Sequence, residues 1–291
     1  MKIIQTLLVL LGGLFPFTLN AGTTVDIYFS HIGMEDGLSH STIFAINQDK
    51  EGNLWFATYD GVNKYDGYNF TVYRHEYANP NSIASDITRC IAIDDSDQIW
   101  VGTREGLSFY NRRKNSFSNY YYKKNGINVP INSIAPIKEN WLMLGTAEGI
   151  LLFDIKKECF INDTLPSLHL LKPTVLVRQG EYIYIGAEDG VYTYTLSGGK
   201  LERLVSMPAG IRIHAILCQM FSRIWMATEG DGLFMYDAKT KELKNYRYES
   251  EQSGLNSNYV RSLELDTENR LWVGTYSGLN IYKEATDNFS S

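Results

Sequence analysis

The chain has 291 residues, of which 44% are hydrophobic and 21% are charged, and this composition excludes a disordered or fibrous protein. It contains 33 acidic and 27 basic residues, which give a formal net charge of −6. Nucleic-acid binding depends on clustered lysine and arginine, so no nucleic-acid partner is expected.

The N-terminal residues 1–21 are predicted to be a secretory signal peptide. A charged start at Lys2 is followed by an apolar run from Ile3 to Phe17 and a small-residue cleavage site at Ala21. A membrane anchor is the competing interpretation, but an uninterrupted span needs about 20 apolar residues, and this run is shorter and broken by glycine and proline. The remaining residues 22–291 are expected to be secreted.

One short pattern organises the rest of the chain. Residues 54–65 predict a strand, a tight turn and a second strand, and recognisable versions of them return five more times. The six repeat cores lie near residues 54–65, 99–110, 142–153, 183–194, 224–236 and 271–282, and they begin 45, 43, 41, 41 and 47 residues apart. A period in the forties with an aromatic strand and a glycine turn is typical of β-propeller blades.

Each repeat can be divided into four strands. In the first repeat these are residues 42–47, 54–58, 62–65 and 68–74, with Asp66-Gly67 as a hairpin turn between the last two. The second strand is almost continuously apolar, which indicates that both of its faces are covered. The sequence therefore predicts an all-β protein, a propeller of about six four-stranded blades.

The third and fourth repeats are less regular than the others. Met143 and Tyr184 stand where other repeats have tryptophan, and an insert at residues 123–130 precedes the third repeat. We still expect both repeats to form blades.

Closure of the ring depends on a fourth strand for the sixth blade. After the sixth core, which ends at residue 282, the chain reaches only residues 287–291, so no fourth strand is expected there. Residues 27–32 resemble a fourth strand and are expected to complete the last blade, which would remove exposed sheet edges. The alternative is an incomplete part of a seven-bladed propeller.

Residues 36–39, 43–49 and 52–67 together resemble the two-component regulator propeller repeat, and residues 79–83 match the linker that these repeats favour. The resemblance extends over nearly all of the chain after the signal peptide. It implies the periplasmic sensor region of a bacterial hybrid two-component system, many of which detect glycan fragments.

The resemblance also implies further parts. In its usual form the family has two seven-bladed propellers, an immunoglobulin-like domain, a membrane helix and a cytoplasmic histidine kinase. This sequence has six repeats, no apolar run of 18 or more residues after residue 25, and no kinase. We therefore expect the N-terminal part of such a sensor, without catalysis of its own, that contacts a membrane only through segments absent here.

An oligosaccharide is the expected ligand, and a homodimer or an adjoining propeller is the expected protein partner. Two other hypotheses are a secreted propeller enzyme acting on polysaccharide, as a lyase or hydrolase, and a structural protein-interaction propeller.

Candidate ligand-binding residues lie where the repeats differ. In a four-stranded blade, the turns between the second and third strands open on the same face as the connections into the first strands. Arginine and tyrosine beside carboxylates could bind an acidic or neutral sugar there. The candidates are Tyr59, Asp60, Arg104, Glu105, Tyr276, His40, Arg89, His214 and Arg261.

No catalytic residue, metal site or cofactor is expected. The recurring threonines, such as Thr58, and the tryptophans are interpreted as structural because they return in successive blades. The histidines lack metal-ligand spacing, and the turn aspartates are expected to hydrogen-bond their hairpins rather than bind calcium. Cys90, Cys159 and Cys218 are far apart and are expected to be small buried hydrophobes rather than disulfide partners.

Overall fold

The computed structural model describes residues 29–137, 140–161, 168, 171–208, 210–220, 222–248 and 254–290. The predicted signal peptide lies outside these residues. Within the described part of the chain, no helix is long and apolar enough to span a membrane. The chain divides into Met1–Ile32 and Gly33–Ser291, and the second unit contains every strand described below.

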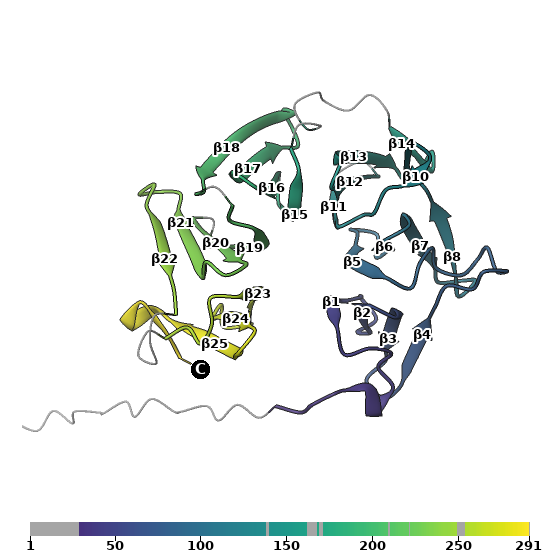
Figure 1. Cartoon of the computed structure of the whole chain (residues 1–291), viewed down its shortest axis with the longest axis horizontal. Coiled ribbons are helices and arrows are strands. Elements are labelled where there is room, and N and C mark those ends of the chain that lie inside the picture. The colour runs from purple at the N-terminus through teal and green to yellow at the C-terminus, as the bar shows by residue number, and fades with distance from the viewer. Residues whose placement is uncertain are drawn as a thin grey trace, which may run out of the picture. The chain divides into compact units, whose positions relative to one another are not determined.

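Gly33–Ser291 forms six four-stranded antiparallel blades that follow one another in chain order around a common axis (Figure 1). Blade 1 contains β1 (Ile43–Gln48), β2 (Leu54–Thr58), β3 (Gly61–Tyr65) and β4 (Phe70–Tyr73), and blade 2 contains β5 (Thr88–Ile93), β6 (Ile99–Thr103), β7 (Leu107–Asn111) and β8 (Ser116–Tyr120). Blade 3 contains β11 (Ser133–Ile137), β12 (Trp141–Thr146), β13 (Gly149–Asp154) and β14 (Cys159–Ile161), and blade 4 contains β15 (Pro173–Gln179), β16 (Tyr182–Ala187), β17 (Gly190–Thr195) and β18 (Lys200–Ser206). Blade 5 contains β19 (Ile213–Gln219), β20 (Arg223–Thr228), β21 (Leu233–Asp237) and β22 (Leu243–Tyr246), and blade 6 contains β23 (Val260–Leu265), β24 (Leu271–Thr275), β25 (Gly278–Lys283) and β26 (Asn288–Ser290).

Three short elements lie outside the blades. The strands β9 (Lys123–Lys124) and β10 (Ile127–Asn128) form a separate hairpin between blades 2 and 3. The 3-10 turns are η1 (Met34–Asp36) and η2 (Glu284–Thr286). The predicted all-β propeller of six four-stranded blades is confirmed, and the two irregular repeats are complete blades.

A buried threonine fixes the turn between the second and third strands. Thr58 Oγ1 donates to the carbonyl of Gly61 at 2.9 Å and accepts the backbone N–H of Asp60 at 3.0 Å. Gly61 has φ +90°, and a Cβ at this position would lie 2.3 Å from the Tyr73 carbonyl oxygen, so only glycine fits. Thr103 and Thr146 make the corresponding bonds in blades 2 and 3, which confirms the structural role predicted for these threonines.

The aspartate of the turn before the second strand also binds the blade core. Asp49 Oδ1 accepts the backbone N–H groups of Glu51 and Asn53, as expected for a turn aspartate, whereas Oδ2 accepts the Trp55 indole N–H at 2.9 Å. The pairs Asp94–Trp100 and Asp266–Trp272 repeat this contact at 3.2 and 2.8 Å. The turn and the tryptophan therefore hold each other in place, a contact that the sequence analysis did not anticipate.

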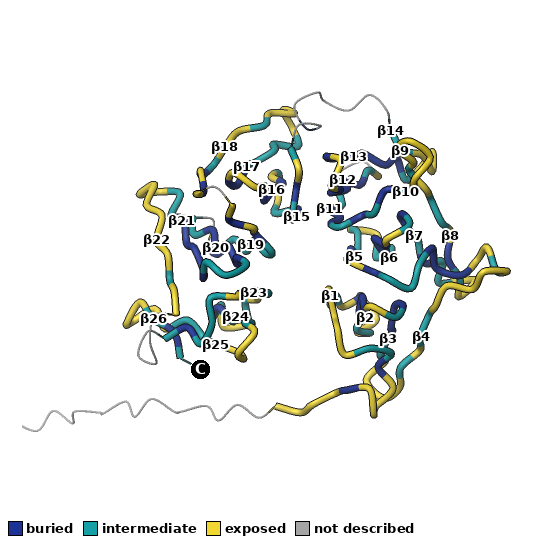
Figure 2. Tube along the Cα trace, in the orientation of Figure 1, coloured by how far each residue is buried: buried dark blue, intermediate teal, exposed yellow. Residues whose placement is uncertain are grey.

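Neighbouring blades pack along their inner strands, which are the first strands of each blade. Contacts join β1 to β5, β5 to β11, β11 to β15, β15 to β19 and β19 to β23, but no comparable contact among the described elements joins β23 to β1. Figure 2 shows β1 largely exposed, in yellow, beside this seam. On the other side of the seam, Leu279 is 40% exposed, whereas its counterparts Val62 and Leu107 are fully buried. Trp272 is likewise only half-buried, in contrast to the other blade tryptophans that were predicted to be core.

Two expectations about the chain are wrong. Blade 6 takes its fourth strand from β26, where Phe289 pairs with Tyr282 and is buried, and not from the N-terminal segment. Residues 29–32 form no strand, and residues 27–28 lie outside the described part of the chain. A strand of three residues is sufficient here because its aromatic side chain fills the space beside Trp225 and Tyr282.

The cysteines are only partly as expected. All three are free, and Cys90 and Cys218 are half-buried in inner strands, but Cys159 is exposed. Cys159 lies in the outer strand β14, which has no further strand beyond it. The expectation that it is a buried hydrophobe is therefore wrong.

Candidate ligand-binding site

A β-bulge opens the inner strand in five of the six blades. In blade 1, Ile43 pairs with Thr58 and Ala45 with Ala57, which leaves Phe44 as the extra residue. A bulge residue has no partner of its own in the ladder, and bulges commonly redirect a side chain beside a functional site. The extra residues of the five bulges are Phe44, Arg89, Thr174, His214 and Arg261. They surround the loop face, the end of the ring at which the turns between second and third strands open.

Bulge residues of neighbouring blades contact one another across the blade boundary. Arg261 donates through Nη1 to His214 Nε2 at 2.7 Å. On another part of the ring, Arg89 Nη1 donates to Oδ1 of Asn132 at 2.9 Å, and Asn132 directly precedes β11. Three of the predicted site residues, Arg89, His214 and Arg261, are therefore bulge residues.

Blades 5 and 6 bring five side chains together in what we call the axial cluster: His214, Glu229, Tyr259, Arg261 and Tyr276. The rings of Tyr259 and Tyr276 stack with centroids 5.2 Å apart and planes within 4°, and both side chains are exposed. The Arg261 guanidinium lies 4.6 Å from the Tyr276 ring centroid and hydrogen-bonds the Tyr276 hydroxyl. An arginine over an exposed aromatic pair offers a flat stacking surface and a charged donor side by side.

Glu229 connects the charged members of this cluster. Its carboxylate oxygens lie 3.4 Å from His214 Nε2, 3.5 Å from Arg261 Nη2 and 3.8 Å from Arg212 Nη1. A β-bridge between Glu229 and Tyr259 holds the two segments together. One carboxylate thus faces two arginines.

The imidazole of His214 is held in its neutral form. Burial lowers the pKa of His214, the neighbouring Arg261 charge lowers it further, and the Glu229 carboxylate opposes both effects. Because Arg261 can only donate, Nε2 of His214 must accept and its proton must lie on Nδ1. The cluster then carries two positive charges, counting Arg212, against one negative charge.

Blade 1 presents a second group of predicted residues. Tyr59 is exposed, with its ring 5.7 Å from His40. Asp60 is bound by Arg74 through Nε and Nη2 at 3.1 and 2.8 Å, and this hydrogen bonding lowers the pKa of Asp60 despite some burial. Asp60 was predicted as a ligand-binding residue, but Arg74 already occupies its carboxylate.

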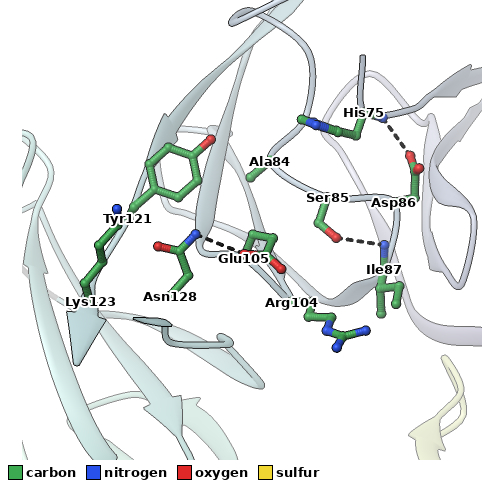
Figure 3. A pocket seen from close by; sticks show the side chains of 10 residues that line it. All are labelled: His75, Ala84, Ser85, Asp86, Ile87, Arg104, Glu105, Tyr121, Lys123 and Asn128. Atoms are coloured by element: carbon green, nitrogen blue, oxygen red, sulfur yellow. Dashed lines mark hydrogen bonds between the residues drawn. The ribbon is translucent and has the colours of Figure 1, made fainter. Parts of the chain in front are cut away.

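The remaining predicted residues, Arg104 and Glu105, lie in a cavity of about 680 Å³ that we call the outer cavity (Figure 3). Its walls come from the connection between blades 1 and 2, from the second-to-third-strand turn of blade 2, and from the insert before blade 3. Its lining includes His75, Asp86, Arg104, Glu105, Tyr121, Lys123 and Asn128. Glu105 Oε2 accepts the Asn128 amide N–H at 2.9 Å.

The predicted residues thus lie at four places on the loop face rather than at one: the axial cluster, the blade 1 group, the outer cavity, and Arg89 beside Asn132. The sequence analysis did not select Tyr259 and Glu229 as site residues, nor Tyr121, Lys123 and Asn128. The insert at residues 123–130 was the available signal for Lys123 and Asn128, because it interrupts an otherwise regular repeat. Within the described part of the chain, no three His, Cys, Asp or Glu side chains are placed to hold a metal ion.

Comparison with known families agrees with this architecture. The family model described as two component regulator propeller matches residues 37–60 and 254–277. The chain carries two-component regulator propeller repeats. Both matched segments run from a connection on the loop face through the first two strands of a blade, and the second contains Tyr259, Arg261 and Tyr276 of the axial cluster.

Individual proteins show the same relationship over different lengths. A segment of 49 residues, 17% of this chain, is 49% identical to part of Histidine kinase P4 from Formosa agariphila, and it corresponds to 4% of that protein. The extracellular domain of the putative hybrid two component system BT3049 from B. thetaiotaomicron is similar with a TM-score of 0.60 and 24% identity, over 87% of this chain and 41% of that one. The corresponding domain of BT4673 has a TM-score of 0.65 and 24% identity, over 89% of this chain and 33% of that one.

Propellers with other functions share the fold. A catalytically inactive variant of virginiamycin B lyase from Staphylococcus aureus has a TM-score of 0.66 at 10% identity, over 86% of this chain and 83% of that one. At such identities a structural likeness establishes the fold alone. The chain spans less than half the length of these two extracellular domains.

Proposed function

We propose that this chain is the ligand-recognising propeller of a two-component signalling protein, located in the periplasm and without catalysis of its own. Two observations support this proposal. The repeats match the two-component regulator propeller model in blades 1 and 6, and a 49-residue segment is 49% identical to part of a histidine kinase.

The axial cluster is the observation that carries the ligand-binding part of the proposal. The stacked Tyr259 and Tyr276 rings give an apolar platform that suits the flat face of a sugar ring. Arg261 and Glu229 add a charged donor and a charged acceptor beside it, as hydroxyl groups require. We therefore propose glycan fragments as ligands of the loop face.

Signal transmission would use the seam between blades 6 and 1. The exposed Ile46 and Leu279 are apolar surface of the kind that blades elsewhere in this chain cover. We propose that an adjoining part of the longer sensor covers this seam and that the sensor acts as a dimer. A ligand can shift the equilibrium between two such packings only by the difference in its affinity for them.

Calorimetric titration of residues 22–291 with a panel of oligosaccharides tests the binding step. Removing Arg261 or the Tyr276 ring by alanine substitution is expected to weaken binding about tenfold or more, because each change deletes a charge-assisted hydrogen bond or a stacking surface. Tyr77→Ala is the matched control, since Tyr77 is fully exposed. If no oligosaccharide gives heat, or both cluster variants bind as the unmodified chain does, the axial cluster is not the binding site.

A separate assay distinguishes recognition from catalysis. A propeller lyase or hydrolase would release new chain ends from polysaccharide, and its turnover would vanish on replacing one particular carboxylate such as Glu229. We expect no turnover across a polysaccharide panel. Turnover that is lost in Glu229→Gln but kept in Asp231→Asn, a turn acid paired with Arg247, would overturn the proposal.

A further inference from the structure

The outer cavity is built by a feature that the other connections do not share. Among the described segments, only the connection from blade 2 to blade 3 forms a hairpin of its own, in which Ile127 pairs with Lys124 and Asn128 with Lys123. This hairpin places Tyr121, Lys123 and Asn128 opposite the Arg104-Glu105 turn (Figure 3). The insert thus adds a wall to blade 2 that a regular repeat would lack.

The two acidic side chains of the cavity are held by neutral donors from its walls. Glu105 Oε2 is bound by the Asn128 amide, and one Asp86 oxygen accepts the backbone N–H of His75 at 2.6 Å. Each carboxylate retains an oxygen that can accept a further hydrogen bond. Hydroxyl groups of a ligand are suitable donors for these positions.

The two cationic side chains of the cavity lack a counter-ion. Within the described part of the chain, neither Arg104 nor Lys123 forms an ion pair, whereas the adjacent Lys124 is paired with Glu148 and Arg74 with Asp60. Both side chains therefore keep N–H donors free for a ligand, although Glu105 and Asp86 line the same cavity. A carboxylate or sulfate would accept charge-assisted hydrogen bonds from them.

An aromatic wall completes the cavity. The Tyr121 ring is partly exposed, and burial together with the Glu105 charge raises the pKa of Tyr121, so its hydroxyl remains a donor. Beside it, Oδ1 of Asn128 is buried without a hydrogen-bond partner. An unsatisfied buried acceptor is destabilising, and a donor that reached it would relieve that cost.

We propose that the outer cavity is a binding site for an acidic saccharide, separate from the axial cluster. The sugar ring stacks on Tyr121, its hydroxyls donate to Glu105 and Asp86, and its carboxylate or sulfate groups accept from Arg104 on one side of Glu105 and from Lys123 on the other (Figure 3). The choice of a sugar rests on the proposed function, whereas the requirement for an anionic group rests on the unpaired cations of this cavity.

Titration with three defined probes tests the proposal: a galacturonic acid disaccharide, galactose 6-sulfate and the neutral galactose disaccharide. The acidic probes are expected to bind at least about tenfold more tightly than the neutral one, because each charge-assisted hydrogen bond contributes about that factor. A preference for the uronate or for the sulfate identifies which anion the cavity accepts. Raising the salt concentration should weaken binding of both acidic probes, because the cavity is open to solvent.

Two substitutions locate the site. Arg104→Gln and Lys123→Gln are each expected to weaken the galacturonic acid disaccharide, which carries two carboxylates, about tenfold and to leave the neutral probe unchanged. Lys114→Gln removes the same charge from an exposed residue outside the cavity and should change neither affinity. Equal binding of acidic and neutral probes, or unchanged binding in both cavity variants, would overturn the proposal. If Arg261→Ala abolishes binding while Lys123→Gln does not, the proposed function stands and this inference fails.

Discussion

Ile46 and Ile91 occupy the same position in the inner strands of blades 1 and 2, yet Ile46 is 53% exposed and Ile91 is 6% exposed. Ile91 packs in a cluster with Trp55 and Ala57 of the preceding blade. Among the described strands, none packs in the corresponding way beside Ile46, since β23 and β1 lack a contact comparable to those that join the other inner strands. The same side chain therefore contributes to packing in one blade and faces the seam in the other.

This difference predicts unequal costs for the same substitution. Ile91→Ala should lower the free energy of unfolding by about 3 kcal/mol, as expected for removing a buried isoleucine, whereas Ile46→Ala should cost less than about 0.5 kcal/mol. Urea denaturation of residues 22–291 measures both. Equal costs would mean that blades 6 and 1 close on each other in solution.

Asp49 should be far more sensitive to substitution than an ordinary turn aspartate. Its fully buried carboxylate accepts bonds from Trp55, from the turn backbone and from Arg112, so Asp49→Ala leaves several donors unsatisfied. We expect a loss of about 3 kcal/mol in the free energy of unfolding. Asp66→Ala, in an exposed hairpin turn, is the control and should cost about 1 kcal/mol or less. Guanidinium unfolding followed by tryptophan fluorescence measures both, and similar costs would show that the indole contact contributes little.

The outer strands of blades 5 and 6 are connected through Asp287, which makes their stability dependent on acid. Its carboxylate accepts from Tyr246 and Tyr282 at 2.5 and 2.7 Å and pairs with Lys244. Burial opposes ionisation, but these contacts outweigh it and lower the pKa of Asp287 from 3.8 to about 2. The resulting stabilisation is complete above pH 3.8 and is lost as the pH falls toward 2. Because the Asp287 side chain is about half exposed, we expect its contacts to contribute about 1 kcal/mol to the free energy of unfolding.

Substitutions of Asp287 and Tyr246 test this dependence of stability on pH. Asp287→Asn should flatten the dependence of unfolding free energy on pH between 3.8 and about 2. Tyr246→Phe removes one donor and keeps the ring, so it should raise the pKa of Asp287. The pH range over which the stabilisation is lost should then become narrower. If the unfolding free energy of Asp287→Asn depended on acidic pH as that of the unmodified chain does, Asp287 would not be the group responsible.

His214 predicts a different dependence on pH. Because its pKa in the folded chain is below the ordinary 6.5, the unfolded chain binds the proton more readily. The contribution of neutral His214 to the free energy of unfolding is therefore complete above about pH 6.5. It is lost as the pH falls through the lower pKa of the folded chain. Nuclear magnetic resonance titration of the imidazole should show this low pKa. Arg261→Gln keeps a donor but removes the charge, so the pKa of His214 should rise, and a fall would contradict the proposed role of Arg261.

Much of the fold was predictable because blade packing repeats in the sequence. The position of Met143 within its repeat assigned it to the place of tryptophan in other blades, and Met143 is fully buried as expected. The fourth strand of blade 6 was not predictable, because Phe289 is buried against Trp225 and Tyr246 of blade 5 as well as against Tyr282 of its own blade. The open seam was equally hidden, since Ile46 and Ile91 are the same residue type.

The sequence could predict which residues lie on the loop face, but it could not predict which of them contact one another. The repeat places Arg104, Tyr276 and Arg261 on the loop face by position alone. That Arg261 contacts His214 depends on bulges that shift the register by one residue, and hydrophobic patterns do not show such shifts. The Asp60–Arg74 pair depends on how far the fourth strand extends, so the sequence could not show that this carboxylate is already occupied.

The bulges allow different residues to serve blade packing and to present side chains at the loop face. A bulge residue takes no place in the ladder between the first and second strands, so the packing of its blade does not determine its identity. Phenylalanine, arginine, threonine, histidine and arginine all occur at this position in one chain. A descendant of this protein could therefore change what the ring recognises one position at a time, without first acquiring extra stability to tolerate the change.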